Sequence, residues 1–569
     1  MTEPIIQVSN LSFRYPGANE DVLTDVNVTI NKGDFTAIIG SNGSGKSTFC
    51  KSLNGLIPHY YVGDYDGTVG INGKNTIQHS VAEIAANVGY VYQDFENQLV
   101  RPRVYDELVF SRMNFGFIDY HEKASEVIDL LNLHAIKNQY IWQLSGGQKH
   151  MVALASVLTM NPEIIIVDEP SAQLDPNNAV DIYKVLKMLN EQYGKTIIVI
   201  EHHTEFIANY CNQVLLMNKG ELAWKYPVHK ALNQVTDLLE RNIFPPQVTQ
   251  AAYQISPERY PYPITVDEAA KYFSTVPQYA TATAPTEDRV NHSNRTALID
   301  LQQVSHTYKT VDKSTKTVLE NINLSFYEDD RVALVGGNGA GKSTLQKMLT
   351  GIQRPGQGSV LVLGRDTKNV SPEELSEFVT YIYQEPEKMF IADNIREDIS
   401  YFLKSRDVPN HEAFVNDIIK QFHLEGLQDR DGRLLSGGQQ RRASLAIGMA
   451  MRPEVILLDE PTASLDVSSR KEMIAMLEKL KKHVRVVIIA THDMELAAEW
   501  ANRIVVMKAG QILADTNGRE LFNNPFLMKQ TGLKPPQITE LSIKLSMQPS
   551  ALHVTDFCQR LEHDQYELY

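Results

Sequence analysis

The chain has 569 residues, of which 43% are hydrophobic and 22% charged, and its formal net charge is -15. This length predicts two or more domains, and the negative charge disfavours a nucleic-acid partner, which would normally need a basic surface. The longest apolar runs are too short to cross a bilayer, and the N-terminus lacks the pattern of a secretory signal, so we expect a cytosolic chain. The unevenly spaced cysteines, Cys50, Cys211 and Cys558, exclude a disulfide framework and are expected to be buried thiols in a reducing compartment.

A tyrosine precedes the first motif in each half of the chain. Tyr15 in FRYPG and Tyr308 in HTYKT lie roughly 30 residues before a GKST sequence. Each is a candidate for stacking on an adenine ring. The alternative is that each tyrosine packs on its own sheet, and the sequence leaves both interpretations open.

The first motif is a glycine-rich loop. Residues 35–39 lead into GSNGSGKST and then an apolar helix, and residues 331–335 lead into GGNGAGKST in the same way. This is the context of a phosphate-binding P-loop, whose backbone N–H groups surround a β-phosphate. The lysine is expected to reach the β- and γ-phosphates, and the next serine to bind Mg²⁺. The predicted nucleotide-binding residues are Gly40, Ser41, Asn42, Gly43, Ser44, Gly45, Lys46, Ser47, Thr48, Gly336, Gly337, Asn338, Gly339, Ala340, Gly341, Lys342, Ser343 and Thr344.

A second glycine-bearing segment, SGGQ, opens an apolar stretch in each half. A serine and two glycines at a helix start expose backbone N–H groups to an anion. A glutamine, Gln93 or Gln384, precedes the serine by 52 residues in both halves and is expected to contact Mg²⁺ or the attacking water. The predicted anion-binding residues are Ser145, Gly146, Gly147, Gln148, Ser436, Gly437, Gly438 and Gln439.

Two acidic residues end an apolar strand in each half. Asp168 and Asp459 are expected to hold Mg²⁺ through water, and the glutamate after each is expected to polarise the attacking water. A histidine after the next apolar strand is expected to bind the γ-phosphate, and the repeat leaves His203 a structural or surface role. The predicted catalytic residues are Glu169, Glu460, His202 and His492. The predicted Mg²⁺ residues are Ser47, Gln93, Asp168, Ser343, Gln384 and Asp459.

These motifs recur because the chain is a duplication. The offset between the halves is 296 residues at the P-loops and 291 at the DEP motifs, so the first half has five additional residues, which fit the stretch PHYYVGDYDG. PPQVTQ returns as PPQITE 290 residues later, and continuing without a gap pairs Thr265, the start of a predicted capping box, with Thr555. We therefore predict an α/β fold with two P-loop domains in tandem, each with a small C-terminal module. The predicted segments are a first domain at 1–239, its module at 240–275, a linker at 276–295, a second domain at 296–529 and its module at 530–569.

Together the motifs resemble those of the ATP-binding cassette (ABC) ATPases, whose signature sequence is LSGGQ. The resemblance covers both halves and implies two cassettes packed head to tail, with each ATP and its Mg²⁺ between the P-loop of one cassette and the signature of the other. The signature at Ser145 would then face the phosphates held by Lys342, and the signature at Ser436 those held by Lys46.

The first half departs locally from this pattern. Lys149 and His150 stand where the second half has glutamine and arginine, and Glu201 stands where the second half has Thr491. These differences bear on whether the two sites turn over equally, not on nucleotide binding.

The stretch YQDFENQLVRPRVYDELVF looks like the segment after the glutamine in energy-coupling factor (ECF) transporter ATPases, in which a helix forms a dock for a membrane scaffold protein. Residues 96–107 and 387–397 would then form two grooves for coupling helices, and the PPQ modules also resemble ECF modules. The resemblance implies the ATPase of a vitamin or metal-ion importer, similar to fused ATPases linked to uptake of thiamine or its pyrimidine precursor. It would lie peripherally on the cytoplasmic face of the cell membrane, with integral scaffold (T-type) and substrate-capture (S-type) subunits.

Two alternatives remain open. A fused sugar-type ABC importer ATPase would share both cassettes but would not explain the PPQ modules or the NQL element. A soluble twin-cassette translation factor would be expected to carry a long, charged helical linker, whereas residues 241–295 hold five basic and five acidic residues.

Overall fold

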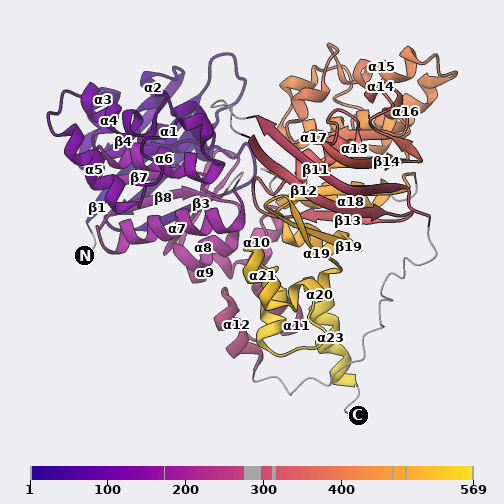
Figure 1. The fold of residues 1–569 in the computed structure, drawn as a ribbon. Helices are drawn as coiled ribbons and strands as arrows, with labels where there is room; N and C mark the ends of the chain where they lie inside the picture. The colour runs from indigo at the N-terminus through magenta and orange to yellow at the C-terminus, as the bar shows by residue number, and fades with distance from the viewer. Residues whose placement is uncertain are drawn as a thin grey trace. The chain divides into compact units, whose positions relative to one another are not determined.

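The computed structural model divides into two compact units, residues 1–275 and 276–569, each of which contains one copy of the repeat. It describes residues 3–566 except for 172, 173, 275–295, 310–314, 464, 466, 481 and 482, so the predicted linker at 276–295 lies outside the described residues. Each unit is α/β, with a four-stranded antiparallel sheet and a six-stranded, mainly parallel sheet (Figure 1). No helix in the described part of the chain combines the length and apolarity that a bilayer crossing requires.

Strand order in the first unit explains where the motifs meet. Its strands are β1 (Pro4–Arg14), β2 (Leu23–Asn31), β3 (Phe35–Ile39), β4 (Asp64–Ile71), β5 (Lys74–Asn75), β6 (Val88–Val91), β7 (Ile164–Asp168), β8 (Thr196–Ile200), β9 (Gln213–Asn218) and β10 (Glu221–Pro227). The sheets have the orders β2-β1-β4-β5 and β10-β9-β3-β8-β7-β6, and β10 is the one antiparallel strand of the second. Strands β3, β7 and β8 are wholly buried, which accounts for their continuous apolar sequences. Because the motifs follow parallel strands, they lie at one edge of the sheet.

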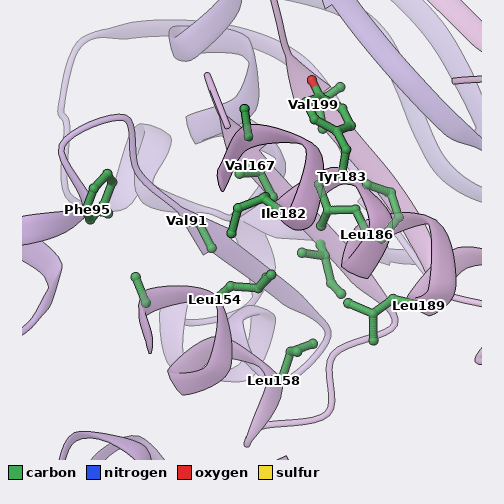
Figure 2. Packing of buried hydrophobic residues seen from close by; sticks show 14 of the residues in the cluster. Val91, Phe95, Leu154, Leu158, Val167, Ile182, Tyr183, Leu186, Leu189 and Val199 are labelled. Atoms are coloured by element: carbon green, nitrogen blue, oxygen red, sulfur yellow. The ribbon is translucent and has the colours of Figure 1, made fainter. Parts of the chain in front are cut away.

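Helices pack on both faces of this sheet. The helices of the first unit are α1 (Lys46–Leu53), α2 (Leu56–His59), α3 (Val81–Ala85), α4 (Val104–Asn114), α5 (Tyr120–Leu130), α6 (Gly146–Leu158), α7 (Pro176–Glu191), α8 (Thr204–Tyr210), α9 (Val228–Leu232), α10 (Val235–Glu240), α11 (Gln247–Ile255) and α12 (Val266–Phe273). Helices α6 and α7 pack on one face, where Leu154 and Leu186 belong to a single buried cluster (Figure 2). On the other face, α1 and the antiparallel sheet enclose a second cluster that includes Phe13 and Phe49. The three cysteines are buried and free, as predicted.

The second unit repeats this arrangement. Its strands are β11 (Ile299–Lys309), β12 (Thr315–Phe326), β13 (Arg331–Val335), β14 (Gln357–Val362), β15 (Arg365–Asp366), β16 (Val379–Ile382), β17 (Val455–Asp459), β18 (Val486–Thr491), β19 (Arg503–Lys508) and β20 (Gln511–Thr516). Its helices are α13 (Lys342–Leu349), α14 (Pro372–Leu375), α15 (Ile395–Ser405), α16 (His411–Gln421), α17 (Gly437–Ala450), α18 (Val467–Leu480), α19 (Met494–Trp500), α20 (Gly518–Phe522), α21 (Pro525–Thr531), α22 (Gln537–Lys544) and α23 (Val554–Tyr566). The sheet orders, β12-β11-β14-β15 and β16-β17-β18-β13-β19-β20, match those of the first unit.

The C-terminal helices correct one detail of the predicted alignment. Helices α11 and α22 begin 290 residues apart, as predicted, but α12 and α23 begin at Val266 and Val554, 288 residues apart. Thr265 therefore does not correspond to Thr555, because α22 and the loop after it are together two residues shorter than α11 and its loop. Thr265 does cap α12, accepting a hydrogen bond from the Glu268 N–H at 3.3 Å, whereas the Glu268 carboxylate accepts from Ile264 instead of Thr265.

Candidate nucleotide sites

Each P-loop is shaped by glycines at positions where a side chain would be strained or would clash. Gly45 and Gly341 precede α1 and α13 with φ of 96° and 104°, in the left-handed region that glycine tolerates. A Cβ on Gly40 would lie 2.4 Å from the Met217 carbonyl oxygen, and one on Gly336 would lie 2.2 Å from the matching oxygen of the second unit. The loops therefore curl tightly at the carboxyl ends of β3 and β13, directly before a helix N-terminus.

The P-loop lysines lie inside these loops. Lys46 Nζ donates hydrogen bonds to the carbonyl oxygens of Gly40 at 2.8 Å and Ser41 at 2.9 Å. Lys342 Nζ donates to Gly336 at 2.7 Å and Gly337 at 3.4 Å, and both lysines are buried. Their ammonium groups are thus held where a phosphate surrounded by the loop would meet them.

The strand-terminal aspartates are buried and paired with tyrosines. Tyr90 donates its hydroxyl hydrogen to Asp168 Oδ2 at 3.0 Å, and Tyr381 donates to Asp459 Oδ2 at 2.7 Å. Burial, together with the charge of Glu169, raises the pKa of Asp168. Its Oδ1 is buried and has no partner at good hydrogen-bond geometry within the described residues, although the nearby Ser47 hydroxyl acts to lower the pKa. An oxygen atom in this state suits a hard cation such as Mg²⁺, and the fit supports the predicted metal role.

Three predicted residues meet in the first unit. Gln93 Nε2 donates to Glu169 Oε2 at 2.7 Å, and His202 Nε2 lies 3.2 Å from Glu169 Oε1. The Glu169 backbone has φ of 51° and donates its N–H to the Ile200 carbonyl, which fixes the residue at the end of β7 beside β8. The carboxylate of Glu169 is therefore positioned by side chains that follow β6 and β8.

The second unit arranges the same residues differently. Glu460 Oε1 lies 3.0 Å from His492 Nδ1 and 3.8 Å from Lys342 Nζ, and Oε2 accepts from the Thr491 hydroxyl at 3.2 Å. Burial alone would raise the pKa of Glu460 and lower that of His492. Because the two side chains carry opposite charges and lie close together, their attraction outweighs burial, so that the pKa of Glu460 is lowered and that of His492 is raised. Gln384 is exposed and makes no hydrogen bond within the described residues, so it does not reach Glu460 as Gln93 reaches Glu169.

Glu201 forms a buried hydrogen-bonded centre that the sequence did not reveal. Its carboxylate accepts from the Ser171 hydroxyl at 2.8 and 2.9 Å and from the Tyr183 hydroxyl at 2.7 Å. It also accepts from the backbone N–H groups of His202 at 2.8 Å and His203 at 2.9 Å. Glu201 thus ties the loop after Glu169 to the loop that carries His202. The presence of a glutamate here, where the second half has Thr491, was the sequence signal for this difference. The tyrosines that pair with the strand-terminal aspartates, Tyr90 and Tyr381, were not predicted, although each lies in a repeated YxYQ pattern.

The SGGQ segments begin two long helices. Ser145 caps α6, because its hydroxyl accepts from the Gln148 N–H at 3.3 Å and its own N–H donates to the Gln148 side chain. Gly146 faces open space, whereas a Cβ on Gly147 would lie 2.5 Å from the Asn178 side chain. In the second unit, Gly437 is open and Gly438 is packed against Ser469 in the same way, and Ser436 N–H donates to Gln439. In each pair, the first glycine therefore has open space beside it, and the second allows the helix to pack closely against a neighbouring side chain.

The residue after each SGGQK or SGGQQ segment is buried in both units. His150 stacks on Phe95 with ring centroids 4.5 Å apart, and neither ring nitrogen has a hydrogen-bond partner within the described residues. Burial lowers the pKa of His150 to about 4. In the second unit, Arg441 occupies this position and donates to the Ala463 carbonyl at 3.1 Å, and burial lowers its pKa to about 10.

We predict that His150 makes the folded chain less stable in acid. Because the folded-state pKa of His150 lies below its ordinary value of 6.5, the unfolded chain takes up the proton first, and stability declines as the pH falls from 6.5 towards 4. His150→Phe keeps the stacking on Phe95 and is expected to remove a loss of about 2 kcal/mol at pH 5. Urea unfolding of both chains at pH 7.5 and pH 5 measures this, and an equal loss in the two chains would contradict it.

The two tyrosines sit against their own sheets. Tyr15 packs edge-on against Phe13 at 4.9 Å, and its hydroxyl lies 3.4 Å from Thr48 Oγ1 beside the P-loop helix. Tyr308 is more exposed and donates its hydroxyl to Gln353 at 3.4 Å. Tyr308 lies in β11 and Tyr15 directly follows β1, and adenine stacking stays a prediction for each.

The fold and these sites define a P-loop nucleoside triphosphatase with two complete sets of motifs. The family described as ABC transporter matches residues 23–172 and 319–463, and the chain therefore belongs to the ABC transporter family. An ABC transporter ATP-binding protein of Caldanaerobacter subterraneus subsp. tengcongensis, so named provisionally, is 33% identical over 558 residues, covering 96% of this chain and 97% of its own. The chain is thus an ATPase that binds ATP with Mg²⁺.

Two solved structures are also similar. The archaeal ribosome recycling factor aABCE1, in complex with the archaeal ribosomal stalk protein aP1, matches 91% of this chain and 92% of its own at a TM-score of 0.58 and 22% identity. This likeness concerns the fold alone, two cassettes in one chain. CbiO1 of Clostridium perfringens, described as part of the ABC transporter complex cbiONQ, matches 42% of this chain and 96% of its own at 28% identity and a TM-score of 0.38, which adds nothing to the assignment.

Proposed function

We propose that this ATPase drives an ECF-type importer of a vitamin or a metal ion, at the cytoplasmic face of the cell membrane. Its partners would be an integral scaffold (T-type) subunit and substrate-capture (S-type) subunits. The observation that carries the proposal is an exposed apolar loop, held by a buried carboxylate, that occurs in the same place in both units. The likeness to a ribosome recycling factor lies in the fold alone and does not favour a ribosomal role.

The two loops are built in the same way. Glu107 Oε2 accepts from the N–H groups of Val100 at 3.0 Å and Arg101 at 2.7 Å. Asp398 Oδ1 accepts from Ile391 and Ala392, both at 2.8 Å. Burial raises the pKa of both carboxylates. Each unit thus desolvates a carboxylate to fix a short loop, which is a cost that a merely connecting loop would not require.

The fixed loops present apolar side chains to solvent. Val100 is 59% exposed and Ile391, at the matching position, is 61% exposed. A single exposed apolar side chain is ordinary on a protein surface, but its recurrence at the matching position of two loops that are held in the same way supports a protein contact there. These loops lie within or beside the segments 96–107 and 387–397, for which the ECF resemblance implies grooves for coupling helices.

In the first unit, this loop is mechanically connected to the nucleotide motifs. The 3-10 helix at Phe95–Gln98 follows Gln93 and leads into the loop. Phe95 stacks on His150 of α6, and Glu96 forms an ion pair with Lys149 at 2.8 Å. A partner that moved the loop would therefore act on both Gln93 and the helix that begins at the signature.

The proposed function also requires head-to-tail pairing of the two cassettes in the ATP-bound state. This pairing would be favoured because the cassettes are tethered in one chain, at an effective concentration on the order of millimolar.

Membrane co-purification tests this function. The tagged wild-type chain, expressed in its own host, is expected to bring down integral membrane proteins, identified by mass spectrometry. Val100→Asp combined with Ile391→Asp should lose them, because a charge at each contact must be desolvated. Tyr193→Asp, at a comparably exposed aromatic after α7, is the matched control and should retain them. Recovery of ribosomes instead of integral proteins would overturn the proposal, and an unchanged melting temperature would show that the double variant is folded.

A further inference from the structure

The two loops differ in chemistry although they share a backbone design. We propose that the first unit binds a partner segment with acidic side chains and that the second binds one with basic side chains. This inference rests on the proposed function. The first dock is defined as Val100, Arg101, Arg103, Tyr140 and Trp142, and the second dock as Ile391, Asp393, Asp431, Arg433 and Leu434.

The first dock is a basic and aromatic surface. Arg103 donates to the Tyr140 hydroxyl at 3.2 Å, and its guanidinium lies 4.9 Å from the centre of that ring. Tyr140 in turn stacks on Trp142 at 4.4 Å, with an interplanar angle of 18°, and Trp142 is 59% exposed. The isolated β-bridge between Arg103 and Tyr140 fixes the loop beside the segment that leads to the signature.

The acidic side chains near this dock form no ion pair with its arginines within the described residues. Glu96 is paired with Lys149, and Glu107 is buried beneath the loop. Arg101 is exposed over the Phe110 ring, and neither it nor Arg103 forms an ion pair within the described residues. The pKa of Arg103 is raised by its hydrogen bond to Tyr140 and, to a smaller extent, by the charge of Asp106, and the charge of Arg101 acts on the buried Glu107. Two guanidinium groups beside aromatic rings form a surface suited to carboxylates, which arginine binds in bidentate fashion.

The second dock reverses this balance. At an offset of 291 residues, Arg101 and Arg103 are replaced by Ala392 and Asn394, and the aromatic pair Tyr140 and Trp142 by Asp431 and Arg433. Arg433 is occupied within its own unit, because it pairs with Asp431 at 2.9 Å and donates to the Ala392 carbonyl at 3.3 Å.

Asp393 is left as the outward charge of the second dock. It is exposed and forms no ion pair within the described residues, although it lies near enough to Arg433 to contribute, after Asp431, to the raised pKa of that group. The other arginine of this segment, Arg396, is directed to Glu412 at 2.8 Å on α16. A carboxylate next to the apolar Ile391 suits a partner segment with a lysine or arginine beside an apolar residue.

Unlike docks would give the assembly a fixed orientation. Opposite charges attract a matching segment and like charges exclude the other one, so charge decides which dock each segment enters more than it decides the total affinity. The apolar Val100 and Ile391 would supply a contact common to both docks. The partner would therefore present two non-equivalent segments, not two copies of one.

Peptide crosslinking tests this inference. The probes are two synthetic amphipathic helical peptides with one apolar face and a photoreactive group, one bearing glutamates and the other lysines. The acidic peptide is expected to label residues near Trp142 of the full chain and the basic peptide residues near Asp393. Arg101→Glu with Arg103→Glu should reduce labelling by the acidic peptide at least tenfold, and Asp393→Arg should do the same for the basic one. Lys184→Glu with Lys187→Glu, on α7, is the matched control.

The outcomes separate this inference from the proposed function. Equal labelling of both docks by the two peptides, or labelling of neither dock, overturns the unlike docks. If wild-type chain still brings down integral membrane proteins in that case, the importer function stands alone. If no integral protein is recovered, the proposed function fails and this inference fails with it.

Discussion

Replacing Glu169 and Glu460 together by glutamine is expected to lower ATP turnover by about 10²–10⁴-fold while ATP still binds. Each carboxylate lies at the end of a buried strand beside a histidine, at 3.2 Å in the first unit and 3.0 Å in the second. Glutamine keeps the shape but cannot take a proton from water, whereas the P-loop contacts of the two lysines are unaffected. Steady-state phosphate release measures turnover, and equilibrium binding of a fluorescent ATP analogue measures affinity.

The single variants add a sharper comparison. Because Glu460 lies near Lys342 and Glu169 is held by Gln93, the two sites are not equivalent, and Glu169→Gln and Glu460→Gln are expected to differ in residual rate. Glu191→Gln, at an exposed position on α7, serves as the control. Phosphate release by the double variant at the wild-type rate would discard the assignment of these glutamates as the base.

Replacing Glu201 by glutamine is expected to lower kcat at the ATP site that uses Glu169 by about tenfold to a hundredfold. This rate is measured in a chain that also carries Glu460→Gln, so that the site that uses Glu460 contributes little. The buried carboxylate accepts from four donors, among them the backbone N–H of His202 and the hydroxyl of Ser171. An amide has one acceptor oxygen, so donors are left unpaired at about 1–3 kcal/mol each. An increase of about 1.4 kcal/mol in the activation free energy lowers a rate tenfold, so part of the lost hydrogen bonding is enough to account for the expected decrease in kcat.

The split between kcat and KM distinguishes positioning from general destabilisation. The side-chain hydrogen bonds of Glu201 within the described residues go to Ser171, Tyr183, His202 and His203 and not to the P-loop, so KM for ATP should change little while kcat falls. Glu201→Asp keeps the charge and should recover part of the rate. A Glu201→Gln chain with a lower melting temperature but wild-type kcat would show that the residue serves stability alone.

Local motifs were readable because their geometry is local. The segment from Gly40 to Lys46 is contiguous, and its glycines and lysine occupy one loop whose shape follows from their own backbone freedom. The end of β7 at Asp168 was likewise predictable from a short apolar pattern, and the free, buried cysteines from their small number and uneven spacing. The helical module was read correctly only where its sequence was strongly repeated, and the two-residue difference before Val554 was missed for lack of such a signal.

The sequence by itself determined the class of fold, the duplication and the residues of each motif, since these depend on short patterns and spacing. Only the tertiary structure decided which of these residues touch: Tyr90 reaches Asp168 across 78 positions, and Glu201 reaches Ser171 across 30. It also decided that Gln93 meets its glutamate while Gln384 does not. The reason is that such contacts depend on strand order and on side-chain burial at the sheet edge, which residues far apart in the chain set together.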